Sequence, residues 1–226
     1  LSVNPSSALA QRELANAYYN AEKFTEAANE YGKYVKNPNH FKQDEDRYAF
    51  LLFYGGDYQK GYDYSTALLQ ANPSNFTAQR YQFMNAAQIK DMQDKLLPMA
   101  EALMAAKKSN PDNKFAPIDY ILIASEFNNA KRPQEAEQIL KEAIQEMPDN
   151  REFYKQLAMT YVEENNLSKA SEAYEGYIKN SEKPGYNDFI QQATFAFYAG
   201  VENKANDPAT AEKYYAMAQD YANKAA

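Results

Sequence analysis

The sequence predicts an all-α fold, a solenoid of stacked antiparallel helix pairs, and three observations support it. A segment that reads as two amphipathic helices occurs several times along the chain. The copies keep a spacing of 34 residues, from Ala27 to Gly61 and from Ala136 to Ala170. Each copy is interrupted by Asn, Gly or Pro, which accept the backbone angles of a sharp reversal. Because one helix pair cannot bury its own apolar face, neighbouring pairs must stack.

The repeated segment has a fixed pattern of large and small residues. It reads Leu-Ala, an aromatic residue three positions after the alanine, a turn, a small residue nine positions after the aromatic, and a large residue four later. Residues 14–31 and 157–174 match most closely, 123–140 keep the spacing, and 48–65 are a looser copy. The small residues of the two helices face each other and let the helices approach closely. They are Ala15, Ala49, Ala124 and Ala158 on the first helices, and Ala27, Gly61, Ala136 and Ala170 on the second.

At these residues the sequence resembles the tetratricopeptide repeat, whose 34-residue pattern ends in a proline. Pro38, Pro73 and Pro148 close three of the copies, and Tyr120 and Tyr154 stand where the family prefers Trp. The resemblance implies a right-handed superhelix of about six helix-turn-helix units. It also implies that the first helices line a groove that binds peptides or other proteins. The wealth of Tyr and Asn and the lack of Cys further resemble repeat proteins of Bacteroides-like bacteria.

We predict one solenoid over residues 8–226, in which four repeats are regular and two are not. The unit at 76–116 is seven residues too long, and its register is not fixed by the sequence. The last unit has a longer connection and is expected to cap the stack. The opening "LSVNPSS" reads as the end of a preceding repeat in a truncated fragment, or as a chance helix-stop pattern. The predicted ranges are 1–7 for that end, then 8–41, 42–75, 76–116, 117–150, 151–184 and 185–226.

Composition excludes several classes of function. A net charge of −7 and a pI near 4.9 argue against nucleic-acid binding, which needs a basic surface. The absence of cysteine excludes disulfides, thiolate nucleophiles and cysteine-ligated zinc. No apolar run reaches the roughly 18 residues that would span a bilayer. The resemblance to exported repeat proteins favours the cell envelope or periplasm over the cytoplasm, and the residues leave the compartment open.

We expect partner-binding residues on the first helices, on the side turned away from the second helices. Aromatic and Arg side chains among them are the usual anchors of an interface. The alternative for Phe50, Phe53 and Met159 is that they only pack between neighbouring helices. The candidates are Arg12, Asn16, Tyr19, Asp46, Phe50, Phe53, Arg80, Met84, Ile121, Ser125, Asn128, Lys155 and Met159.

Two more specific sites are not supported by the sequence. Repeats that bind chaperone C-termini use a clamp of Lys, Asn and Arg, and this chain has Arg47, Thr77 and Tyr81 where clamp residues are needed. His40 has no partners at metal-ligand spacing, and the acidic run 43–47 lacks the glycine and alternating oxygen ligands of a calcium loop. We therefore expect no catalytic residues, no metal and no cofactor.

The sequence leads to a non-catalytic scaffold that binds a protein or peptide partner in the groove of a repeat superhelix. The alternative is an accessory or regulatory segment of a longer enzyme or of a cell-envelope assembly protein. Self-association through exposed terminal repeats is a third hypothesis, because an unpaired end of a solenoid leaves apolar surface open.

Overall fold

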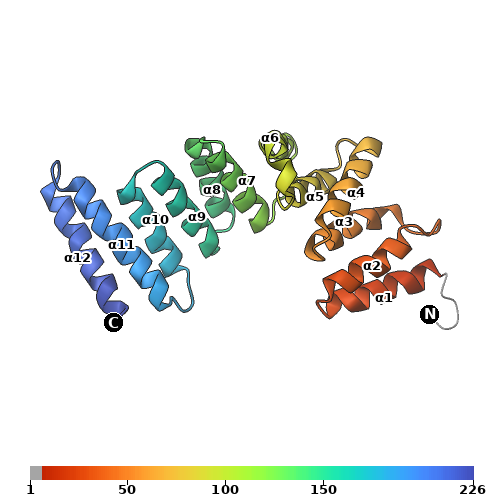
Figure 1. The fold of residues 1–226 in the computed structure, drawn as a ribbon, viewed down its shortest axis with the longest axis horizontal. Helices are drawn as coiled ribbons and strands as arrows, with labels where there is room; N and C mark the ends of the chain where they lie inside the picture. Colours follow the sequence, from red (N-terminus) through yellow and green to blue (C-terminus); the bar gives the residue numbers. More distant parts are fainter. Residues whose placement is uncertain (1–6) are drawn as a thin grey trace. The chain divides into compact units, whose positions relative to one another are not determined.

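A computed structural model describes residues 7–226, and all regular structure in this range is helical. The predicted all-α class, built from stacked helix pairs, is confirmed. Consecutive helices reverse direction at short turns and pack as antiparallel pairs (Figure 1). The α-helices are α1 (Ala8–Asn20), α2 (Phe24–Tyr34), α3 (Glu45–Tyr54), α4 (Tyr58–Ala71), α5 (Phe76–Ala86), α6 (Gln93–Ser109), α7 (Pro117–Asn129), α8 (Pro133–Glu146), α9 (Arg151–Glu163), α10 (Leu167–Lys179), α11 (Tyr186–Asn203) and α12 (Pro208–Lys224), with the short 3-10 helices η1 (Lys42–Asp44) and η2 (Lys90–Met92).

Each of the six ranges from 8–41 to 185–226 holds one pair of α-helices. The expectation for residues 1–7 lies outside the described residues, apart from Ser7. That serine is the N-cap of α1, and its hydroxyl accepts a hydrogen bond from the Ala10 amide at 3.4 Å. A capping hydroxyl satisfies an amide that has no partner within the helix.

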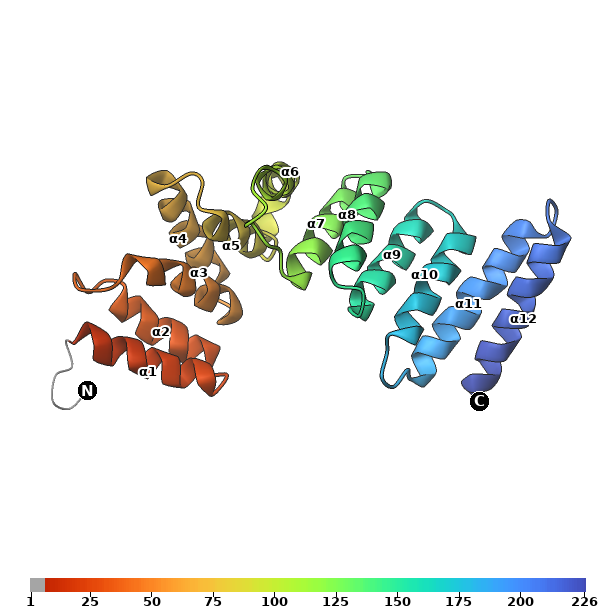
Figure 2. The same cartoon turned by 180° about the vertical axis from the view of Figure 1, so that it is seen from behind.

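The chain divides into two compact units, each with its own core. The first unit, Leu1–Lys114, contains α1 to α6 in its described part, and the second, Phe115–Ala226, contains α7 to α12. Within each unit, successive helix pairs lie side by side (Figures 1 and 2). The cores are rich in tyrosine, with Tyr31 and Tyr120 both fully buried.

Four of the turns inside the pairs share one backbone geometry. Glu22, Gly56, Lys131 and Asn165 have φ values of 57°, 78°, 60° and 54°. The residue after each of them donates its amide hydrogen to a carbonyl five positions back, as Lys23 does to Tyr18 at 3.0 Å. A left-handed residue followed by this bond is the usual way to close a helix C-terminus. Within each unit these turn residues are 34 positions apart, which is the period of the sequence.

The small residues that the sequence places at the helix contacts are buried. Ala15, Ala27, Ala136 and Ala170 have no exposed surface. At Gly61 a Cβ atom would lie 2.5 Å from Oδ1 of the Asn85 side chain, so only glycine fits there without a shift. These small residues are therefore buried at helix contacts, and the close neighbour of Gly61 belongs to α5, the first helix of the following pair.

The third pair departs from the pattern because of its connection. Residues 87–92 join α5 to α6 and include η2, in which Asp91 leaves the helical region of the backbone. The regular pairs use three residues at this point, 21–23 in the first pair and 130–132 in the fourth. The longer connection accounts for part of the extra length of range 76–116, and α6 is also longer than the second helices of the regular pairs.

Candidate partner-binding surfaces

The first unit carries a cluster of aromatic side chains on its first helices α1, α3 and α5, with one further ring, Phe24, from the start of α2. Phe50 of α3 lies at its centre, with ring centroids 5.8 Å from Tyr19 of α1 and 6.0 Å from Tyr81 of α5. Both contacts are edge-to-face, the geometry that the charge distribution of aromatic rings favours. We call this group the aromatic cluster of the first unit. Its members are Tyr19, Phe24, Phe50, Phe53, Tyr54 and Tyr81.

One edge of the aromatic cluster is open to solvent. Tyr54 is 45% exposed although its ring lies 4.5 Å from Phe50 and 5.8 Å from Phe24. The exposed Arg47 places its guanidinium carbon 4.6 Å from the centre of the Tyr19 ring. A cation over an aromatic face orders both groups while leaving the hydrogen-bond donors of the guanidinium at the surface. The cluster thus combines apolar area, rigid rings and a positive charge.

The structure brings Tyr19, Phe50 and Phe53 together and engages Asp46 and Arg12 in contacts within the chain. Asp46 accepts a hydrogen bond from the side chain of Asn75, the N-cap of α5, at 2.9 Å. Arg12 Nε lies 2.8 Å from Oδ2 of Asp44, a buried carboxylate. These side chains therefore join neighbouring repeats in the structure.

Asp44 is the centre of a buried polar group between α1, α2 and α3. The hydroxyl of Tyr34 donates to Oδ2 of Asp44 at 2.8 Å and accepts from the Phe41 amide at 2.9 Å. Burial raises the pKa of Tyr34, and it raises the pKa of the neighbouring Tyr31 to about 12. Both phenols therefore stay neutral, and Arg12 supplies the charge that balances the carboxylate.

The prediction that Met84 binds a partner is wrong. Its side chain has no exposed surface, so it is a core residue of α5 and is closed to a partner. The error follows from the third repeat, where the register was uncertain. Arg80 lies on the same helix, half-buried, with its guanidinium carbon 5.6 Å from the Tyr81 ring centre. Asn16 is half-buried on α1.

In the second unit the predicted residues are half-buried on α7 and α9. Asn128 of α7 donates a side-chain hydrogen bond to the Thr160 hydroxyl of α9 at 2.9 Å, which joins the two first helices. The ammonium group of Lys155 lies 5.6 Å from the Tyr177 ring centre on α10. The remaining three, Ile121, Ser125 and Met159, are partly exposed.

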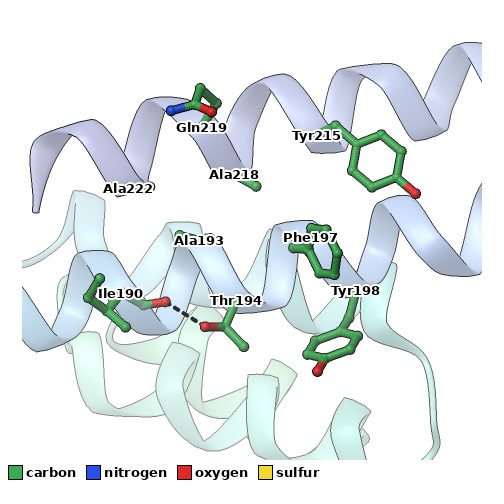
Figure 3. Close-up of a pocket in the computed structure, with 9 residues that line it drawn as sticks. All are labelled: Ile190, Ala193, Thr194, Phe197, Tyr198, Tyr215, Ala218, Gln219 and Ala222. Atoms are coloured by element: carbon green, nitrogen blue, oxygen red, sulfur yellow. Dashed lines mark hydrogen bonds between the residues drawn. The ribbon is translucent and has the colours of Figure 1, made fainter.

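A second exposed apolar surface lies on α11, and the sequence prediction missed it. Ile190, Phe197, Tyr198 and Val201 are between 39% and 51% exposed. Ile190, Phe197 and Tyr198 border a pocket of about 580 Å³ together with residues of α12 (Figure 3). The spacing 190, 194, 197, 198 and 201 is that of one helix face. This spacing indicates a second, exposed stripe on α11 beside the buried residues Phe195, Ala196 and Ala199. The stripe was overlooked because the register of the sixth repeat was not fixed by the sequence.

His40 has a structural environment. Its Nδ1 lies 2.7 Å from the carbonyl oxygen of Asn37, and its Nε2 lies 3.0 Å from Oε1 of Glu45. The hydrogen bond to Glu45 is the main cause of a raised pKa for His40. In residues 7–226 no group of His, Asp and Glu side chains is arranged to hold a metal ion. In the same range no helix combines the length and apolar character needed to cross a membrane.

These features define a helical-repeat protein with two compact units. Residues 129–192, from the end of α7 into α11, match the tetratricopeptide repeat family. The resemblance to this family that the sequence predicted is thereby confirmed over these residues. None of the curated proteins matches it.

Several solved structures are similar in fold. MamA from Desulfovibrio magneticus, from residue 41 to its end, shares 17% sequence identity with a TM-score of 0.62, over 76% of this chain and 94% of that one. A tetratricopeptide repeat protein from Parabacteroides merdae also shares 17% identity with a TM-score of 0.62, over 96% and 86%. YrrB, described as having an unusual peptide-binding site, shares 16% identity with a TM-score of 0.61, over 84% and 91%. At these identities the likeness is one of fold.

Proposed function

We propose that this chain is a non-catalytic scaffold that binds a protein or peptide partner on the first helices of its repeats. The observation that carries the proposal is the open edge of the aromatic cluster, with Tyr54 and Arg47 at the surface of the first unit. Solenoids of stacked helix pairs offer extended surfaces for binding. YrrB, which shares the fold, is described as having a peptide-binding site, and this agrees with the proposal.

The chemistry of the aromatic cluster suits an extended peptide with apolar side chains and an acidic group. Tyrosine and phenylalanine rings that are already packed against one another lose little conformational entropy when a partner covers them. Removal of their exposed edges from water provides the driving force. The guanidinium of Arg47 selects a carboxylate or a backbone carbonyl beside the rings. The acidic character of the whole chain disfavours acidic partners elsewhere on its surface, so the position of Arg47 adds selectivity.

A selection experiment tests this proposal directly. A phage library of random linear peptides is selected on the full chain, and the enriched peptides are synthesised. Their affinity is then measured for the parent and for the double variant Arg47→Glu, Tyr54→Ser. Both side chains are exposed, so the variant is expected to fold. We expect the dissociation constant to rise by about tenfold or more, as for anchor residues at other interfaces.

The matched control is Phe197→Ser, which removes an exposed aromatic ring from the second unit and leaves the aromatic cluster intact. It should bind the selected peptides like the parent. The proposal fails if the selection enriches no peptide, or if the double variant keeps the parent affinity while its circular dichroism spectrum is unchanged.

A further inference from the structure

His40 lies in the connection between the first two helix pairs, and both of its ring nitrogens face oxygen atoms. Nδ1 lies 2.7 Å from the carbonyl oxygen of Asn37, and Nε2 lies 3.0 Å from Oε1 of Glu45, the first residue of α3. The ring of Tyr34 on α2 packs edge-on against the imidazole, with centroids 6.0 Å apart. The His40 side chain is only 17% exposed, so it is enclosed by α2, the connection and the start of α3.

Only the protonated ring of His40 satisfies both contacts. A neutral imidazole has one N–H donor and one acceptor nitrogen, whereas the imidazolium ion donates at both nitrogens. The carbonyl of Asn37 and the ionised carboxylate of Glu45 are acceptors only. A neutral ring would therefore direct one nitrogen lone pair at an oxygen lone pair, and one of the two contacts must be lost when the proton leaves.

The charges around the ring favour its protonated form. The carboxylates nearest to it are those of Glu45 and of the preceding residue, the buried Asp44. Arg12 of α1 is the cation that faces Asp44, and the hydroxyl of Tyr34 donates to the same carboxylate. The hydrogen bond to Glu45 is the main reason why the pKa of His40 lies above its ordinary value, although burial acts in the opposite direction. With His40 protonated, two cations balance the two carboxylates.

The segment that His40 holds also contacts α1 and α2. The side chain of Asn37 donates to Oε1 of Gln11 on α1 at 3.2 Å. The backbone amide of Phe41 donates to the hydroxyl of Tyr34 on α2 at 2.9 Å. The two contacts of the imidazole ring therefore tie a segment that is bonded to the first pair to the first residue of the second pair.

The aromatic cluster begins next to this junction. Arg47 follows Glu45 by two residues and holds its guanidinium carbon 4.6 Å from the centre of the Tyr19 ring on α1. Phe50, one turn further along α3, contacts the same ring. The open edge of the aromatic cluster thus depends on the alignment of the two first helices that the segment around His40 joins.

We propose that His40 is a pH-sensitive link between the first and second helix pairs, closed when its ring is protonated and open when the ring is neutral. Opening releases the start of α3 from the connection and loosens the alignment of α1 with α3. A rise in pH then weakens the binding of a peptide at the aromatic cluster. The effect on peptide binding rests on the proposed function, whereas the link itself does not.

The state of the ring can be measured directly, because His40 is the only histidine of the chain. NMR of the full chain labelled in histidine gives the titration midpoint of the ring and shows whether both nitrogens carry protons. We expect two protonated nitrogens at mildly acid pH and a midpoint above the ordinary pKa of 6.5. Hydrogen exchange of residues 37–45, corrected for the intrinsic rate, is then measured below and above the midpoint. Protection should fall by about twofold to tenfold above it, as expected for the loss of one hydrogen bond.

The variant Glu45→Gln separates a pH-sensitive link from a merely structural contact. An amide at this position can donate to the unprotonated Nε2 while Nδ1 donates to Asn37, so the neutral ring keeps both contacts. We expect a lower titration midpoint than in the parent, and a protection of residues 37–45 that stays constant across it. The matched control is Glu26→Gln, which removes an exposed carboxylate from the first turn of α2 and should behave like the parent.

Peptides selected for the aromatic cluster provide the functional measurement. Peptides without histidine and with a blocked N-terminus are used, because they do not titrate in the same range. Their dissociation constant for the parent should rise across the midpoint, by up to about tenfold, and should stay constant for Glu45→Gln. If no peptide is enriched, the proposed function fails, and the NMR and exchange measurements still decide whether His40 is a pH-sensitive link.

Three results would overturn the inference. One is a ring that titrates at or below the ordinary pKa of histidine. Another is a protection of residues 37–45 in the parent that is the same on both sides of the midpoint, or that falls equally in Glu45→Gln. The third is a peptide affinity that stays constant while protection falls, because the link would then have no effect on the aromatic cluster.

Discussion

The two units use the same repeat but differ in the interaction at one matched position between successive helix pairs. At one helix position the first unit has Tyr19, whose ring packs against Phe50 of the next first helix at 5.8 Å. At the corresponding position the second unit has Asn128, which is hydrogen-bonded to Thr160 of the next first helix at 2.9 Å. Further polar bonds follow in the second unit, as from the Ser168 hydroxyl of α10 to Oε2 of Glu202 on α11 at 2.7 Å.

The difference teaches how strictly each kind of contact fixes the repeat. A hydrogen bond weakens steeply when its distance or angle changes, whereas aromatic rings keep favourable contacts over a range of orientations. Each unit has two regular pairs at the 34-residue spacing and one irregular pair, α5 and α6 in the first unit and α11 and α12 in the second. The match to the tetratricopeptide repeat family lies in the second unit. In the first unit the irregular pair lies next to the aromatic cluster.

The largest expected effect comes from removing a core ring from either unit. Phe83 of the first unit is 1% exposed and Phe153 of the second has no exposed surface. Each change to alanine should cost about 3–5 kcal/mol of unfolding free energy, through lost burial and the cavity that remains. Because repeat proteins are stabilised by nearest neighbours, the loss should fall mainly on the unit that carries the change.

Hydrogen exchange measured by mass spectrometry shows in which unit stability is lost. We expect Phe153→Ala to lower protection in 115–226 and Phe83→Ala to lower it in 7–114. An equal loss of protection in both ranges from either variant would show that the two cores unfold as one.

A smaller effect on stability is expected from the contacts between successive first helices, the hydrogen bond in the second unit and the ring contact in the first. In a double-mutant cycle, Asn128→Ala and Thr160→Val should show a coupling of about 0.5–1.5 kcal/mol, the net value of a hydrogen bond. At the matched position of the first unit, Tyr19→Phe keeps the ring contact with Phe50 and should change stability by less than about 0.5 kcal/mol. Urea denaturation measures both. A coupling near zero for the Asn128 pair would remove the distinction between the units.

The smallest effect is a pH dependence confined to the first unit, which contains the only histidine of the chain. The hydrogen bond to Glu45 raises the pKa of His40 in the folded state above the ordinary value of 6.5. Its contribution is therefore fully present below that value and is lost as the pH rises through the raised pKa. Relative to His40→Gln, the parent should have its largest advantage in Tm at mildly acid pH, and none at alkaline pH. A difference in Tm that is constant with pH would contradict this assignment.

Much of the fold could be predicted from the sequence because its signal is local and repeated. The 34-residue spacing and the small residues at Ala27, Gly61, Ala136 and Ala170 indicated the helix pairs, and these residues are buried as expected. The third pair could not be placed, because residues 87–92 add a 3-10 turn that has no counterpart in the regular copies. Without a register, Met84 was assigned to the surface although it belongs to the core.

The candidate surfaces were less predictable, because they depend on contacts between repeats. Helix periodicity shows which side of a helix Arg12 occupies, but the buried Asp44 that pairs with it comes from the following repeat. Phe197 and Tyr198 belong to a helix face that the repeat pattern does not constrain, since no helix of the described chain covers it. The spacing of residues in the sequence therefore predicts contacts within a helix pair better than it predicts contacts between pairs or the faces that stay exposed.

The left-handed turns have a consequence for how such a chain can change over evolutionary time. Glu22 and Lys131 hold a backbone conformation that costs an ordinary residue about 1–2 kcal/mol relative to glycine, and Gly56 fills the same position in another copy. The helices on either side impose the turn whichever residue occupies it. The repeat architecture can thus persist after the glycine that would identify the turn has been replaced. Copies can diverge in sequence while keeping the same backbone path.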